Sequence, residues 1–230
     1  MCGTCGCTKP LLRPFRVEQL ERKVLDKNTR LAAENRAAFQ TSALLVINFM
    51  SSPGSGKTTL LERTIERMSP PVFVIQGDQA TDNDAARVRR AGAKAVQINT
   101  GQGCHLDASM IERATKELEP TPGSLLAIEN VGNLVCPAMF DLGETYRVAV
   151  ISVTEGDDKP LKYPHMFRSS DLVLINKLDL LEHCDFDLEA CHDNILTMNP
   201  RAEILTVSAR RGDGMDAWLG WLRSRLESPA

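Results

Sequence analysis

The sequence predicts an α/β fold in which helices flank a mostly parallel sheet. Seven short apolar runs recur along the chain, and helical stretches separate many of them. Such runs are typical of strands that are buried on both faces. The first run also leads directly into a glycine-rich loop and a helical pattern. The seven expected strands are 44–50, 72–75, 95–98, 125–128, 148–153, 172–175 and 204–207.

Length and composition fit one globular domain of ordinary size. The chain has 230 residues, of which 43% are hydrophobic and 25% charged, and its formal net charge is -3. The longest apolar run, 43–50, is far shorter than the roughly 20 residues that a membrane span needs, and the N-terminus lacks the apolar region of a signal peptide. We therefore expect a cytoplasmic protein with neither a nucleic-acid nor a membrane partner.

The N-terminal part is expected to differ from the rest of the chain. Residues 1–16 contain three cysteines and two prolines but no periodic apolar pattern, which predicts a flexible metal-binding tail and linker. Residues 17–40 predict an exposed amphipathic helix, and residues 41–230 a single nucleotide-binding domain that ends in a helix over 215–226. The apolar positions that predict the first helix are Val17, Leu20, Val24, Leu31 and Ala38.

The loop after the first strand has the pattern and the context of a Walker A motif. Its glycines let backbone N–H groups face phosphate oxygens, while Lys57 reaches the β and γ phosphates and Thr58 binds Mg²⁺. Ser51 stands where the pattern has its first glycine. The alternative is a glycine-rich turn that merely begins a helix. The candidate phosphate-binding residues are Gly54, Ser55, Gly56, Lys57, Thr58 and Thr59.

A second motif indicates which base the protein binds. Asn176-Lys177-Leu178-Asp179 follows the strand 172–175 and matches the guanine-binding NKxD pattern. The Asp179 carboxylate can accept hydrogen bonds from guanine N1–H and from its exocyclic amine, which adenine cannot offer. Lys177 covers the base with its alkyl chain, and Asn176 ties the loop together. Ser208 and Ala209 follow the last strand and match the loop whose backbone N–H meets guanine O6. The sequence therefore predicts GTP and GDP binding.

Hydrolysis of GTP requires neutralisation by Mg²⁺ and an oriented water. Asp78 and Glu129 each follow a strand, where ligands of parallel sheets bind. We expect Asp78 in the Mg²⁺ shell and in switch I, and Glu129 with Gly132 in switch II, so that Lys57, Thr58 and these two carboxylates form the catalytic set. Either carboxylate could instead only cap the following segment. Because no glutamine is an evident water-positioning residue, we expect slow turnover.

The N-terminal cysteines predict a metal site. Cys2, Cys5 and Cys7 place three thiolates within six residues, and loss of Met1 would add the Cys2 amine as a fourth ligand. One nitrogen and three thiolates suit square-planar Ni²⁺, whereas tetrahedral Zn²⁺ would usually recruit a histidine or a fourth cysteine. The alternative is a reactive tail without a physiological metal.

A second thiolate cluster is expected near the nucleotide. Cys104 and His105 follow the strand 95–98, and Cys136 follows the segment that begins at Glu129. Three ligands make an incomplete site, which water or a second subunit would complete. A buried cysteine and a capping histidine remain the alternative. Because Cys136 would move with switch II, the γ phosphate could alter metal affinity.

Several of these motifs occur together in one known family. They are Cys2–Cys7, Ser51–Thr58, Gly101–Leu106, Glu129–Pro137, Lys162–Phe167 and Asn176–Asp179. Over nearly its whole length the chain resembles the hydrogenase nickel incorporation GTPases, the HypB family. The resemblance implies a P-loop GTPase fold of the SIMIBI class and a homodimer linked by nucleotide or metal. It also implies a tight Ni²⁺ site at the N-terminal cysteines and a weaker Ni²⁺ or Zn²⁺ site at Cys104, His105 and Cys136.

The resemblance further implies a role in the maturation of nickel–iron hydrogenase. Nickel would pass to the hydrogenase large subunit together with a small partner metallochaperone. Many relatives carry a histidine-rich stretch after the N-terminus that this chain lacks, so bulk nickel storage by that device is not expected. The alternatives are a metal-responsive scaffold with incidental GTPase activity, a urease accessory GTPase, and a zinc-storage protein with a vestigial P-loop.

Overall fold

The computed structural model describes residues 13–78, 83–101 and 103–227. Seven strands form one sheet in the order β3-β2-β4-β1-β5-β6-β7, and every neighbouring pair is parallel. The predicted α/β fold is confirmed, with all seven expected strands present and the sheet parallel throughout. The strands are β1 (Leu45–Ser51), β2 (Val72–Asp78), β3 (Lys94–Asn99), β4 (Leu125–Glu129), β5 (Tyr146–Ser152), β6 (Leu172–Asn176) and β7 (Glu203–Thr206).

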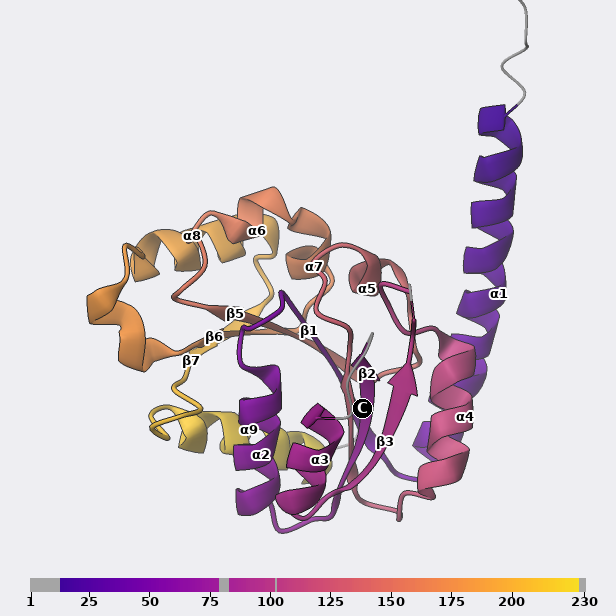
Figure 1. Ribbon diagram of the computed structural model, residues 1–230, viewed down its shortest axis with the longest axis horizontal. Helices are drawn as coiled ribbons and strands as arrows, with labels where there is room; N and C mark the ends of the chain where they lie inside the picture. Colours follow the sequence, from indigo (N-terminus) through magenta and orange to yellow (C-terminus); the bar gives the residue numbers. More distant parts are fainter. Residues whose placement is uncertain (1–12, 79–82, 102, 228–230) are drawn as a thin grey trace, which may run out of the picture.

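Helices connect the strands and cover both faces of the sheet (Figure 1). One face packs against α2, α3 and α9, and the other against α1 and α4 at one end and α7 and α8 at the other. The helices are α1 (Arg13–Thr41), α2 (Lys57–Arg67), α3 (Asn83–Arg90), α4 (Ala108–Leu118), α5 (Cys136–Met139), α6 (Lys159–Lys162), α7 (Pro164–Arg168), the 3₁₀ helix η1 (Leu178–His183), α8 (Leu188–Met198) and α9 (Met215–Glu227).

The apolar side chains of the strands alternate between the two faces. In β1, Ile47 and Phe49 join the core under α2, α3 and α9, whereas Val46 and Met50 face the opposite layer. In α9, Trp218 is fully buried and donates a hydrogen bond from its indole nitrogen to the Thr64 hydroxyl at 2.9 Å. The helix expected over 215–226 is thus confirmed. Burial on both faces explains why the strands read as continuous apolar runs.

Helix α1 differs from its sequence prediction in its start and in its buried side. It begins at Arg13 rather than at residue 17, because Pro14 falls in the first turn, where a missing N–H breaks no helical hydrogen bond. Val24 and Ala38 were expected on the apolar face but are exposed, and the buried positions are Asn28, Ala32, Asn35 and Phe39. Two of the four are asparagines, which a search for apolar periodicity does not count.

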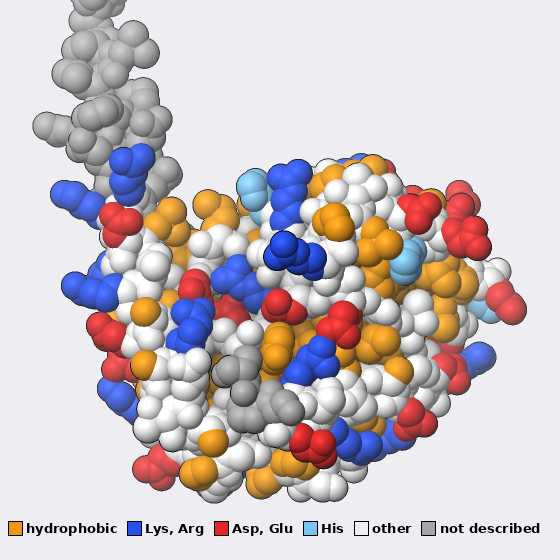
Figure 2. Space-filling model, turned by 180° about the vertical axis from the view of Figure 1, so that it is seen from behind, with side chains coloured by type: hydrophobic (Ala, Val, Ile, Leu, Met, Phe, Trp, Pro, Cys, Tyr) orange, Lys and Arg blue, Asp and Glu red, His pale blue; other side chains and the backbone are white. Residues whose placement is uncertain are grey.

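The C-terminal half of α1 lies along α4, and the N-terminal half projects beyond the body of the molecule (Figure 1). Acidic and basic side chains are mixed over the face that Figure 2 shows. Within the described ranges, no helix combines the length and the apolar character that a membrane span requires, α1 included.

Candidate functional site

The loop between β1 and α2 curls around its own lysine. Gly54 and Gly56 have φ angles of +74° and +97°, a region that favours glycine. A Cβ on Gly56 would lie 2.5 Å from the Asn176 side-chain nitrogen, so a larger residue is excluded here. The Lys57 ammonium and the Ser55 hydroxyl both donate hydrogen bonds to the Ser51 hydroxyl. Ser51, which departs from the general pattern, therefore holds the loop lysine in place.

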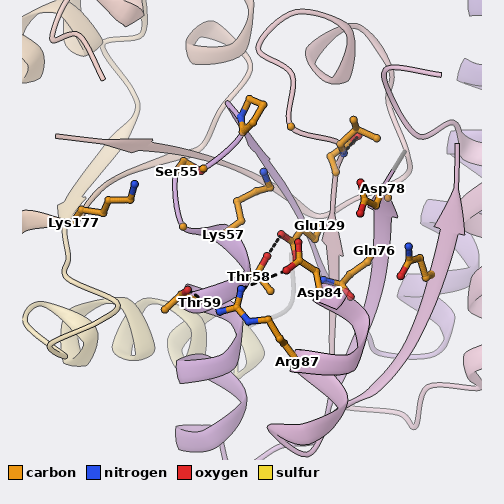
Figure 3. A pocket seen from close by; sticks show the side chains of 18 residues that line it. Ser55, Lys57, Thr58, Thr59, Gln76, Asp78, Asp84, Arg87, Glu129 and Lys177 are labelled. Carbon is orange, nitrogen blue, oxygen red and sulfur yellow. Dashed lines mark hydrogen bonds and ion pairs between the residues drawn. The ribbon is translucent and has the colours of Figure 1, made fainter. Parts of the chain in front are cut away.

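Thr58, Glu129 and Gln76 form a buried polar group under this loop (Figure 3). The Thr58 hydroxyl donates to one Glu129 carboxylate oxygen at 2.7 Å, and the Gln76 amide donates to the other at 2.8 Å. Burial raises the pKa of Glu129 and lowers the pKa of Lys57, although their opposite charges attract. The Gln76 carbonyl oxygen has no hydrogen-bond partner among the described residues. Sequence reasoning missed Gln76.

A cavity of about 550 Å³ opens beside this group, and the candidate phosphate-binding residues 54–59 line it. Asp78 lines it from the end of β2, and Gly132 from the segment after β4. Thr58, Asp78 and Glu129 offer hydroxyl and carboxylate oxygens to the cavity, and such oxygens suit Mg²⁺. Two residues of α3 that the sequence did not single out, Asp84 and Arg87, also line the cavity. Arg87 donates hydrogen bonds to the Thr59 hydroxyl at 3.0 Å and to the Glu62 carboxylate at 2.6 Å.

The base-side motifs meet at the ends of β6 and β7. The Asn176 amide donates to the Ser55 carbonyl at 2.9 Å and accepts from the Ala209 N–H at 3.1 Å, so it joins three loops. Ser208 donates to the Asp179 carboxylate at 2.5 Å. Lys177 has a positive φ of 61° and stands apart from the phosphate-side residues in Figure 3.

A cavity of about 440 Å³ lies over these loops. The residues that line it come from the NKxD motif, from the segment after β7 and from the start of α2. They are Gly56, Thr59, Asn176, Lys177, Asp179, Leu180, Ala209 and Arg210. Apart from the buried Ser208, the predicted base-binding and phosphate-binding residues therefore face two cavities that share Gly56, Thr59 and Lys177.

The structure brings Cys104, His105 and Cys136 together, each half-buried. One ligand atom from each lies within 4.8 Å of the others, and Cys104 Sγ is 3.5 Å from His105 Nδ1. The His105 ring stacks on Phe140 with a centroid distance of 3.8 Å. Burial lowers the pKa of His105, which favours the neutral imidazole, the form that binds a metal. A hydrogen bond with Cys104 raises the pKa of the Cys136 thiol. Two thiols and an imidazole suit Ni²⁺ or Zn²⁺ and leave one ligand position open.

Buried contacts connect this cluster with the nucleotide cavities. Asn130, which directly follows Glu129, accepts the Leu106 N–H at 3.3 Å and the Val131 N–H at 3.0 Å. A Cβ on Gly77 would come within 2.8 Å of the Leu106 side chain, so β2 packs closely against the residue after His105. The segments that hold the candidate metal ligands thus contact those that hold Asp78 and Glu129.

The remaining expectations concern cysteines and histidines. Cys2, Cys5 and Cys7 lie outside the described residues. Cys191 is buried within α8, as expected, and burial raises its pKa to about 12. His183 and His192 are exposed, also as expected.

The chain matches known proteins over most of its length. Residues 45–206 match the family model described as CobW/HypB/UreG, nucleotide-binding domain. The hydrogenase maturation factor HypB of Azotobacter chroococcum is 59% identical over 222 residues, which cover 96% of this chain and 73% of the relative.

Two solved structures resemble the fold closely. HypB from Archaeoglobus fulgidus is 46% identical, with a TM-score of 0.82, and the match covers 88% of this chain and 100% of that one. HypB from Helicobacter pylori, described as a complex with nickel, is 41% identical, also with a TM-score of 0.82, and the match covers 87% of this chain and 95% of that one.

Proposed function

Because the chain belongs to the CobW/HypB/UreG family, and within it to the hydrogenase maturation factors HypB, we propose that it is a GTP-hydrolysing nickel metallochaperone. It binds Ni²⁺ and delivers it, under control of the GTP cycle, to the large subunit of nickel–iron hydrogenase. The identities, the P-loop and the Cys104, His105 and Cys136 cluster support this proposal.

The observation that carries the proposal is the contact between the two sites. Glu129 bonds the Walker A threonine, and the next residue, Asn130, bonds the backbone beside His105. Cys136 lies seven residues after Glu129 on the same segment. A shift of this segment on binding the γ phosphate would change the distance between Cys136 and the other two ligands, and metal affinity depends on such distances.

The phosphate chemistry falls to Lys57, Thr58, Asp78 and Glu129. Lys57 is poised at the loop to bind the phosphates, and Thr58, Asp78 and Glu129 offer the oxygens that would hold Mg²⁺. The bound cation supplies neutralisation of the negative charge that develops on the phosphates. Asp179 selects guanine, while Asn176 and Lys177 position the base; turnover is expected to be slow.

The metal is cargo and has two proposed binding places. Cys2, Cys5 and Cys7 form the tight Ni²⁺ site, and Cys104, His105 and Cys136 form a weaker site for Ni²⁺ or Zn²⁺. Because the second site offers three ligands, a homodimer or a small partner metallochaperone would supply the missing position. The open position also gives the ion a route out toward the hydrogenase large subunit.

An anaerobic Ni²⁺ titration tests the proposal. Thiolate-to-nickel absorption is followed for the full chain and for a variant lacking residues 1–10, each with GDP and with a non-hydrolysable GTP analogue. We expect the deletion to remove the tight site and the nucleotide to change the affinity of the weaker one. A GTP hydrolysis assay on the same samples establishes turnover.

Each alternative function predicts a different result. Equal nickel affinity with both nucleotides would favour a metal-responsive scaffold with incidental GTP turnover. A preference for zinc at the N-terminal site would favour zinc storage. Nickel delivery to urease without any to hydrogenase would favour the urease accessory role.

A further inference from the structure

Two of the buried residues of α1 are polar, and they contact the chain next to the segments that carry the candidate metal ligands. Asn28 and Asn35 are 6% and 4% exposed, two turns apart on the helix. An amide is costly to bury unless it is hydrogen-bonded, so the partners of these two side chains determine where α1 can dock.

Each asparagine joins two separate segments of the chain. Asn35 Nδ2 donates to the Ala108 carbonyl at 2.9 Å and to the Leu142 carbonyl at 3.0 Å. Asn28 accepts the Ala108 N–H at 2.9 Å and donates to the Asp141 carbonyl at 2.7 Å. The backbones of residue 108 and residues 141–142 are therefore held against the same helix.

Both segments lead directly to the candidate metal ligands. Ala108 is three residues after His105, and Asp141 follows Phe140, on which the His105 ring stacks. Helix α5, which begins with Cys136, lies just before Phe140. A displacement of either segment along α1 would thus move one side of the ligand cluster relative to the other.

Further contacts join α1 to the loop after Phe140. Gly143 has a φ of +90°, and a Cβ there would lie 2.7 Å from the Ala32 carbonyl oxygen. The Arg36 guanidinium bonds both Asp141 carboxylate oxygens, at 2.7 and 2.9 Å. Burial opposes ionisation of Asp141, but the hydrogen bonds from Arg36 and from the Gly143 N–H outweigh it and lower its pKa.

We propose that α1 is a brace for the inner metal site, in which Asn28 and Asn35 are positioning residues that hold the Cys104–His105 and Cys136 segments at ligand spacing. This inference rests on the proposed metal site and adds to it the element that sets its geometry. The brace acts through the backbone, so it affects metal affinity without touching the metal or the nucleotide.

The test measures Ni²⁺ binding in the full chain with Cys2, Cys5 and Cys7 replaced by serine, so that the inner site reports alone. In this background we compare Asn35→Leu with the matched exposed control Glu34→Gln. We expect Asn35→Leu to weaken nickel binding about ten-fold and to alter the thiolate-to-nickel absorption band, because support of ligand positions is worth roughly this much. Affinity for a fluorescent GDP analogue should stay within about two-fold.

Gly143→Ala is a second variant, to be used if Asn35→Leu lowers the unfolding temperature of the protein too far for the titration. It places a methyl group against the α1 backbone and strains the positive φ of residue 143, without removing a hydrogen-bonding side chain, and it should weaken nickel binding in the same direction. Amide hydrogen exchange of the metal-free protein should speed up at 103–108 and 136–142 relative to the Walker A helix.

The failure of the brace and the failure of the site give different results. Unchanged nickel affinity in both variants, while Cys136→Ser abolishes binding, would overturn the brace and leave the metal site standing. Unchanged binding in Cys136→Ser as well would overturn the metal site itself.

Discussion

The nucleotide side and the metal side of the molecule are held together in different ways. At the nucleotide side, functional residues bond one another directly: the Thr58 side chain bonds that of Glu129, and the Asn176 side chain bonds the backbone at Ser55 and Ala209. At the metal side, two ligands lie on a loop and the third begins α5, and the backbones next to these ligands are held by residues outside the cluster, chiefly Asn130 and helix α1. The geometry of the metal side can therefore be changed by substitutions that touch neither the metal ligands nor the nucleotide.

Cys136→Ser should produce the largest effect and should break the metal side alone. Removing one of three ligands is expected to weaken inner-site nickel binding more than about 100-fold, because supporting groups alone are worth about 10–100-fold. GDP affinity should not change. Nickel affinity is measured by titration in the background without N-terminal cysteines, and GDP affinity by the fluorescence of a GDP analogue.

Cys191→Ala is the matched cysteine control for this prediction, since Cys191 is buried in α8. It should leave nickel binding as it is. Equal loss in both variants would mean that the cysteine content, rather than the cluster, governs the measurement.

Asp179→Asn should break the nucleotide side alone. It removes a charged acceptor from two hydrogen bonds to guanine, which together cost about 3 kcal/mol or roughly 100-fold in GTP affinity. Xanthosine triphosphate, with a carbonyl in place of the exocyclic amine, should bind better than GTP. Calorimetric titration with both nucleotides checks this, with the exposed Asp185→Asn as control; retained preference for GTP would contradict the assignment.

Asp78→Ala tests whether the end of β2, which packs against Leu106, takes part in GTP hydrolysis. Losing one of the candidate Mg²⁺ carboxylates should reduce GTP turnover at least about ten-fold while GDP affinity stays normal, since GDP lacks the γ phosphate. Phosphate release at saturating GTP gives the rate. Unchanged turnover would remove Asp78 from the mechanism.

Gly132→Ala should give the smallest effect and sharpen the boundary between the two sides. A Cβ there would lie 3.0 Å from Pro53 Cα and N, so the Walker A loop or the segment after Glu129 must shift. We expect a two- to five-fold loss of affinity for a GTP analogue, about 0.5–1 kcal/mol. Gly220→Ala in α9, where a Cβ has open space, serves as control and should leave nucleotide affinity alone.

Much of the fold and of the nucleotide side could be predicted because their signals are local. The strand runs reflect burial on both faces, and the Walker A and NKxD patterns fix residue types at short spacing. The proximity of Cys104, His105 and Cys136 is long-range and was predicted from the position of their strands and from the family resemblance. Gln76 and Arg87 were missed because their partners, Glu129 and Glu62, come from other elements.

Asn28 and Asn35 were missed for a different reason. A helix is recognised by its apolar periodicity, and these two asparagines are buried because they bond the backbone at the start of α4 and in the segment after Phe140. Nothing in the sequence near Asn35 predicts its hydrogen bonds to the backbone of residues 108 and 142. Only the folded chain brings them together.

The projecting half of α1 sets a distance. From Arg13 to Asn28 the helix advances about 22 Å at 1.5 Å per residue. The N-terminal half of α1 is therefore a helical spacer: a group attached to the chain before Arg13 starts about 22 Å along the helix axis from Asn28, the residue that contacts the Ala108 and Asp141 backbones.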